Sequence, residues 1–266
     1  MTTSDVSAEP ATPSSPTLSP IGWRQLLFAP IVGLLLGGLL VVVLSAAWLM
    51  IVLQGAGAFE VARATALLQG NFYANMMTVA GFYIPAIWLL WRAAKKLAPA
   101  PAARFFPPVS GITILLGLAT GVLASLACLV LEDYLSRTFG ISFELSAAER
   151  GMFPVTTVQL AVAVAVMGFL GPFAEELYFR GFLLGWLRQW MGTLPAIALS
   201  ALVFAIVHLF MFVHPGASGW ITTGEIFGVG ILMGLWVART GSLWSSYAVH
   251  IGYNCVVVLQ LYLSQA

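Results

Sequence analysis

The sequence predicts an all-α fold, a polytopic transmembrane bundle of about seven helices. Of the 266 residues, 60% are hydrophobic and only 8% are charged, and the mean hydropathy is +0.96. A soluble domain carries about 25% charged residues, so most of this surface is expected to face lipid. The apolar runs are long and do not alternate in polarity, which favours helices of about 20 residues over the strands of a membrane barrel.

The apolar runs divide into about seven expected helices. They cover residues 26–53, 72–91, 112–131, 156–170 with a continuation through 190, 196–213, 226–237 and 243–263. Within the fourth run, Gly171-Pro172 either bends one helix or joins two segments. Residues 1–20 are rich in Ser, Thr, Pro and Ala and are expected to form a disordered, solvent-exposed tail, followed by N-terminal membrane helices in residues 21–150.

Cationic side chains predict how the chain is oriented. The densest group follows the second expected helix: Arg92, Lys95, Lys96 and Arg104. The positive-inside rule places this loop in the cytoplasm, and the N-terminus with it. We therefore expect a multi-pass protein of the cell membrane whose partner along most of its surface is the lipid bilayer. A net charge of +1 gives no reason to expect a nucleic acid partner.

The first candidate site motif contains two adjacent carboxylates, Glu175 and Glu176, and ends at Arg180. Ionisable residues within membrane segments are costly and therefore indicate function. Because Glu176 and Arg180 are four residues apart, they share a helix face and can form an ion pair. Glu175 points about 100° away and is expected to be the unpaired carboxylate, suited to act as a general base. Alternatively, both are interfacial loop charges near Arg180 and Arg188.

The second motif is a histidine, His208, in an otherwise apolar helix that offers it no local polar partner. We expect its partner to lie across the bundle. A membrane histidine can serve catalysis or metal binding, or it can hold helices together through a hydrogen bond.

The third motif pairs His250 with Asn254, four residues later on one face of the last helix. The two side chains can stabilise an oxyanion, or the imidazole can bind a metal while the amide orients water. Alternatively, they cap each other. Taken together, one acid and a histidine on each of two other helices form the set needed to activate water for amide hydrolysis.

Several other residues are expected to be structural. Cys128 and Cys255 lack C-x-x-C spacing and are expected to be buried as small hydrophobic side chains. His214 falls in a His-Pro-Gly turn, and Glu225 is expected at the start of a helix. The Leu and Phe stripes of the first three helices indicate packing or lipid-facing surface, so no function is expected there.

In this order the three motifs resemble the CPBP family, also called type II CAAX prenyl endopeptidases or the Abi family. The motifs are E-E-x-x-x-R at Glu175, Glu176 and Arg180, F-x-x-x-H at Phe204 and His208, and H-x-x-x-N at His250 and Asn254. The resemblance covers about residues 155–260. It implies that residues 151–266 form a catalytic transmembrane domain, an intramembrane metalloendopeptidase acting on a membrane protein or peptide substrate. The Glu176 and Arg180 pair would then hold the site.

The resemblance also implies roles for the remaining polar residues. Glu175 and His208 would activate the attacking water, while His250 and Asn254 would bind a metal or stabilise the oxyanion. If Zn²⁺ is the cofactor, His208, His250 and Glu175 would supply three ligands and leave one position for water. Without zinc, Glu175 would act with His208 directly.

Functions of other classes remain open at this stage. The same polar residues could hold helices together in a non-catalytic membrane scaffold or a bacteriocin self-immunity protein. Glutamate and histidine within a membrane also form the proton relays of transporters.

Overall fold

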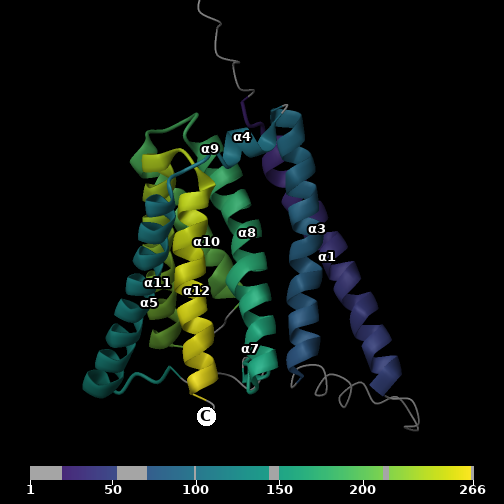
Figure 1. The fold of residues 1–266 in the computed structure, drawn as a ribbon, viewed down its shortest axis with the longest axis vertical. Coiled ribbons are helices and arrows are strands. Elements are labelled where there is room, and N and C mark those ends of the chain that lie inside the picture. The colour runs from purple at the N-terminus through teal and green to yellow at the C-terminus, as the bar shows by residue number, and fades with distance from the viewer. Residues whose placement is uncertain (1–19, 53–70, 99, 144–149, 212–215, 265–266) are drawn as a thin grey trace, which may run out of the picture.

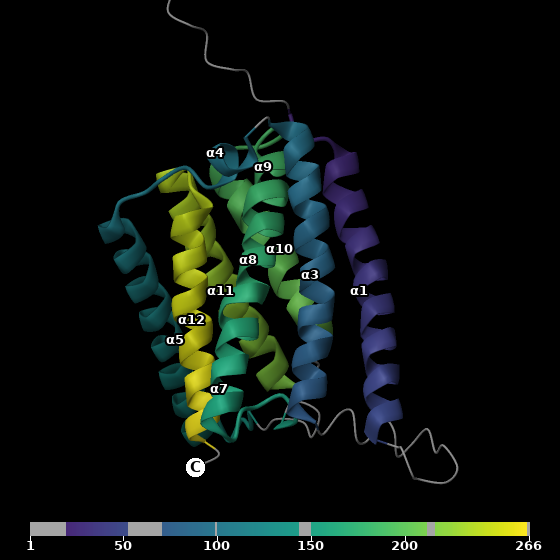
Figure 2. The same ribbon diagram turned by 45° about the vertical axis from the view of Figure 1, so that its right-hand side comes forward.

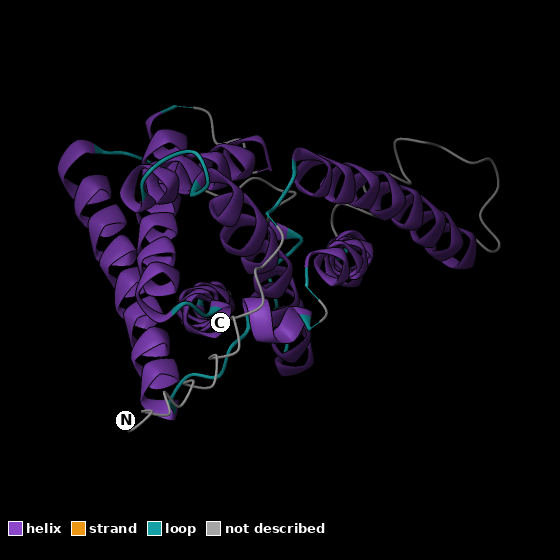
Figure 3. Ribbon diagram, turned by 90° about the horizontal axis from the view of Figure 1, so that it is seen from above, coloured by secondary structure: helices purple, strands orange, loops and turns teal. Residues whose placement is uncertain are grey.

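The regular structure consists of helices alone in the part of the chain that the computed structural model describes, residues 20–52, 71–98, 100–143, 150–211 and 216–264. The view along the bundle in Figure 3 shows these helices joined by loops. The disordered tail expected for residues 1–20 lies outside these ranges except for Pro20.

The long helical segments run in alternating directions along the bundle (Figure 1). They are α1 (Trp23–Val52), α3 (Phe72–Leu97), α4 (Pro101–Phe105), α5 (Gly111–Phe139), α7 (Thr157–Ala163), η1 (Val164–Leu170), α8 (Gly171–Glu175), η2 (Glu176–Leu183), α9 (Leu184–Leu187), α10 (Thr193–Met211), α11 (Ala217–Thr240) and α12 (Leu243–Leu263). The seven expected runs fall on these helices. In the described ranges, five segments are long and apolar enough to cross a membrane, so the polytopic bundle is confirmed.

Local capping sets several helix ends. Ser110 precedes α5, and its hydroxyl accepts a hydrogen bond from the Thr113 amide at 3.1 Å, as an N-cap does. Gly140 ends the same helix at φ 67°, in the left-handed region that glycine adopts without strain. Gly241 does the same for α11 at φ 70°, and Ser242 then caps α12.

The segment from Thr157 to Leu187 is one continuous helical run that stands between α3 and α12 (Figures 1 and 2). Gly171-Pro172 therefore does not separate two segments. A proline ring clashes with the carbonyl four residues before it in an α-helix, but here the preceding turns, η1, are π-helical and wider. The Gly171 amide accordingly bonds to the Val166 carbonyl, five residues back.

Small residues allow α5 and α12 to approach closely. A Cβ atom added at Gly121 would collide with the Val249 carbonyl oxygen, and one at Gly252 would collide with the Leu118 carbonyl oxygen. Membrane helices pack tightly where small residues let their backbones meet. This contact fixes the position of α12, which carries His250 and Asn254.

Candidate active site

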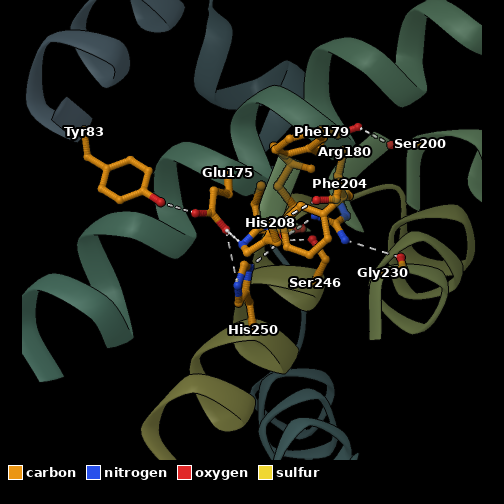
Figure 4. A network of polar contacts seen from close by, with 12 residues as sticks. Tyr83, Glu175, Phe179, Arg180, Ser200, Phe204, His208, Gly230, Ser246 and His250 are labelled. Atoms are coloured by element: carbon orange, nitrogen blue, oxygen red, sulfur yellow. Dashed lines mark hydrogen bonds and ion pairs between the residues drawn. The ribbon is translucent and has the colours of Figure 1, made fainter. Parts of the chain in front are cut away.

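Side chains from four helical segments meet in one network of polar contacts (Figure 4). Glu175 ends α8, His208 lies on α10, His250 on α12 and Tyr83 on α3. The Glu175 Oε2 atom lies 3.9 Å from His208 Nε2 and 3.6 Å from His250 Nε2. The structure therefore brings together the acid and the two histidines that the three motifs singled out.

The second carboxylate of the motif, Glu176, is completely buried and holds two partners. Its Oε1 lies 3.2 Å from Arg180 Nη1 and 2.9 Å from His250 Nδ1. The expected ion pair between Glu176 and Arg180 is thus present, with side chains 0% and 1% exposed. A buried pair of this kind needs additional hydrogen bonds to offset the loss of hydration. Arg180 donates one to the Gly230 carbonyl at 3.4 Å, and its guanidinium lies over the Phe204 ring.

Hydrogen bonds define which nitrogen of each imidazole faces Glu175. His208 Nδ1 lies 2.8 Å from the Phe204 carbonyl oxygen, and a carbonyl can only accept. His250 Nδ1 contacts the ion-paired carboxylate of Glu176, which also accepts. Both Nδ1 atoms therefore donate, and both Nε2 atoms are directed at Glu175. His208 thus has a polar partner in its own helix, contrary to the expectation of none, and a further one across the bundle.

Glu175 is not the unpaired carboxylate that its place on the helix suggested. The Tyr83 hydroxyl of α3 donates a hydrogen bond to Glu175 Oε1, and Figure 4 shows Tyr83 approaching from the side opposite the histidines. The Glu175 side chain is 13% exposed, so its carboxylate still reaches open space. The motifs missed Tyr83. The only signal in the sequence was a phenol in an apolar helix, which needs a hydrogen-bond partner when buried.

Asn254 has a structural partner in the π-helical turn. Its Nδ2 atom donates to the Met167 carbonyl oxygen at 2.8 Å. In a π-helix that carbonyl would accept from residue 172, but Pro172 has no amide hydrogen. Asn254 supplies the missing bond, which a backbone group within a membrane requires. The interpretation that His250 and Asn254 cap each other is therefore wrong.

A cavity of about 900 Å³ borders these residues. Glu175, His208, His250 and Asn254 line it, whereas Glu176 and Arg180 lie behind its wall. The N-terminal helices contribute lining residues too, among them Tyr83. No function was expected from the Leu and Phe stripes of the first three helices, yet α3 supplies both a wall of the cavity and the donor to Glu175.

The outcomes differ among the other residues that were expected to be structural. Glu225 does not start a helix, because α11 begins at Ala217, two turns earlier; its side chain lines the cavity instead. Cys128 and Cys255 are free thiols and half-buried. His214 lies outside the described residues.

No group of three or more His, Cys, Asp and Glu residues has the spacing of a metal site within the ranges that the structure covers. Glu175 Oε2 nevertheless lies within 3.9 Å of both histidine Nε2 atoms. Zinc binding by Glu175, His208 and His250 therefore stays a prediction.

Comparisons with known proteins bear on the site as a whole. Residues 157–256 match the family model described as Rce1-like, type II CAAX prenyl endopeptidase. Searches of curated proteins and of solved structures returned no match. The matched range begins with α7 and includes all three motifs, so the resemblance that the motifs suggested is confirmed. Residues 157–256 are therefore similar to the Rce1-like, type II CAAX prenyl endopeptidases.

Proposed function

We propose that this protein is an intramembrane endopeptidase in which Glu175, with His208, activates the water that attacks a peptide bond. The observation that carries the proposal is the convergence of one carboxylate oxygen and two imidazole Nε2 atoms at the wall of a cavity inside a membrane bundle. A general base needs this arrangement, a proton acceptor that is fixed by its neighbours and open to water.

The reaction can be written with this chain's own residues. Glu175 accepts a proton from water as the water oxygen bonds to the carbonyl carbon of the substrate. His208 Nε2, 3.9 Å away, helps to hold that proton. When the tetrahedral intermediate collapses, the C–N bond breaks and the proton passes to the departing amine. The products are a carboxylic acid and an amine, which become a carboxylate and an ammonium ion when the acid gives its proton to the amine, and Glu175 returns to its first state.

His250 is placed to stabilise the oxyanion. Its Nδ1 donates to Glu176, so Nε2 can donate to an oxyanion only when the ring is an imidazolium. That cation would lie between the carboxylates of Glu175 and Glu176. The arrangement resembles the acid that orients the histidine of a serine protease. Glu176 is then a positioning residue, held in turn by Arg180. Asn254 lines the same cavity, and the second hydrogen of its amide can also donate to the oxyanion.

The scaffold alternative accounts for only part of this network. Glu176, Arg180 and Asn254 do tie helices together, through Gly230 of α11 and Met167 of η1. Glu175 and His208, in contrast, line the cavity with side chains 13% and 16% exposed. Groups that served only to join helices would be expected to be fully buried. This difference favours the endopeptidase over a scaffold or self-immunity protein that lacks catalysis.

The test compares protein termini by mass spectrometry in membranes from cells that express the wild type or Glu175→Gln at equal levels. Asp133→Asn serves as the matched control, since Asp133 is an exposed carboxylate paired with Arg137. New termini are expected with the wild type and the control and absent with Glu175→Gln. Equal termini from all three proteins would overturn the proposal.

A further inference from the structure

The buried carboxylate of Glu176 is held through one of its two oxygen atoms. Its Oε1 lies 3.2 Å from Arg180 Nη1 and 2.9 Å from His250 Nδ1. Its Oε2 is also buried, yet it has no hydrogen-bond donor among the residues that the structure describes. Within the same residues, Arg180 Nη1 makes no contact with hydrogen-bond geometry, so the guanidinium neutralises the charge without fixing the plane of the carboxylate. A buried charge needs directed hydrogen bonds as well as a counter-charge.

Ser246 places a hydroxyl beside this carboxylate. It lies on α12, one turn before His250, and is fully buried. Its hydroxyl is within hydrogen-bonding reach of Glu176 and belongs to the network in Figure 4, although it donates to the Leu243 carbonyl of its own helix at 3.2 Å. In an α-helix that carbonyl also accepts from the amide four residues later. Turning the hydroxyl toward Glu176 therefore leaves no backbone group unpaired.

Ser246 is not placed to act as a nucleophile. The described residues that line the cavity include Glu175 and His250 but not Ser246. A nucleophilic serine has to reach the carbonyl carbon of the substrate and needs a base within hydrogen-bonding distance. The hydroxyl of Ser246 instead lies behind the cavity wall, beside Glu176. It can therefore affect the reaction only through that carboxylate.

We propose that Ser246 is a second positioning residue, whose hydroxyl donates to Glu176 Oε2 and fixes the carboxylate that orients His250. A hydrogen bond to a charged acceptor is stronger than one to a neutral carbonyl, so the hydroxyl gains by leaving Leu243. With Oε2 held, the carboxylate cannot rotate, and Oε1 stays on His250 Nδ1. The ring then keeps Nε2 directed at Glu175. The effect of Ser246 on the rate rests on the proposed function, whereas the hydrogen bond itself does not.

Two substitutions of Ser246 separate the hydrogen bond from packing. Ser246→Ala removes the hydroxyl, and Ser246→Cys fills its space with a much weaker donor. Ser245→Ala is the matched control, because Ser245 is the preceding residue of the same helix and is equally buried. Its hydroxyl donates to the Ser242 carbonyl at 2.8 Å. The control therefore removes a buried serine hydroxyl of α12 without changing the surroundings of Glu176.

The first measurement follows the Nδ1 proton of His250 by NMR, in full-length protein with isotope-labelled histidine in detergent micelles. The chain has three histidines, and the signal of His250 is assigned by its loss in His250→Gln. In the wild type and Ser245→Ala, this proton should exchange slowly with water. In Ser246→Ala and Ser246→Cys it should exchange at least about tenfold faster. Unchanged exchange in both Ser246 variants would overturn the proposal. So would wild-type exchange in Ser246→Cys alone, which would assign the effect to packing.

The second measurement is the cleavage of a peptide that spans a site found by terminus mapping. In both Ser246 variants kcat should fall about tenfold or more with KM unchanged, and Ser245→Ala should keep the wild-type values. A rise in KM at constant kcat would place Ser246 in substrate binding and overturn the positioning role. If the wild type cleaved no peptide, the proposed function would fail, while proton exchange at His250 would still decide the role of Ser246.

Discussion

Tyr83 donates a hydrogen bond to Glu175 across a separation of 92 residues in sequence. The tyrosine belongs to α3, outside the range that matches the family model, and the glutamate belongs to α8, within it. Because Tyr83 and the two histidines approach the carboxylate from different sides, they restrict its rotation. The N-terminal helices therefore help to position the residue proposed as general base.

Replacing Tyr83 by Phe removes this hydrogen bond and leaves the ring in place. Hydrogen bonds to charged groups contribute about 1.5–3 kcal/mol, so kcat should fall by about 10- to 150-fold. KM should change little, because the bond positions Glu175 rather than substrate. The measurement is the kinetics of cleavage of a peptide that spans a site identified by terminus mapping.

Tyr73→Phe is the matched control for that variant. Tyr73 lies on the same helix with 45% of its surface exposed, and its substitution should leave both constants unchanged. If Tyr83→Phe raised KM and left kcat as it was, Tyr83 would act in substrate binding and the positioning role would be wrong.

Local spacing predicted those parts of the site that depend on one helix. The four-residue separation of Glu176 and Arg180 was enough to predict their ion pair, and the long apolar runs were enough to predict the bundle. Tyr83 and the Met167 carbonyl could not be assigned, because their partners come from other helices and depend on how the bundle packs. The start of α11 was predicted two turns too late, at Glu225, because the polar residues Thr222 and Thr223 before it interrupt the apolar run; the helix begins at Ala217.

Glu175 and Glu176 are adjacent, yet their substitutions should affect different properties: Glu176→Gln should lower stability, and Glu175→Gln should lower kcat. Glu176→Gln leaves the buried Arg180 guanidinium without its counter-charge, and breaking a buried pair in this way costs about 3–5 kcal/mol. Glu175→Gln removes a partly exposed carboxylate and should change stability little while lowering kcat at least about 100-fold. The measurements are unfolding in mixed detergent micelles and peptide cleavage.

A double variant separates the charge from the packing. In Glu176→Gln/Arg180→Met, neither member of the buried pair is left as an unpaired charge, so the loss of stability should be smaller than the sum of the two single losses. Additive losses would contradict a direct energetic coupling between the two side chains.

The zinc prediction is checked by metal content. If His208, His250 and Glu175 bind zinc, the purified protein should contain about one zinc per chain, and His208→Ala should lose it. Removing the metal with a chelator should abolish cleavage, and zinc should restore it. Full activity in protein shown to be free of metal would contradict the prediction and favour direct action of Glu175 with His208.

Asn254→Ala distinguishes the two roles that the amide can have. The substitution leaves the Met167 carbonyl without a donor at membrane depth, where Pro172 cannot replace it. An unsatisfied buried group costs about 1–3 kcal/mol, so unfolding should shift by that amount even without substrate. Asn254→Asp is the matched variant, since its carboxylate has the same shape but cannot donate to a carbonyl, and it should destabilise at least as much. If both variants unfolded like the wild type and lost only kcat, the amide would serve the oxyanion and the π-helical turn would not depend on it.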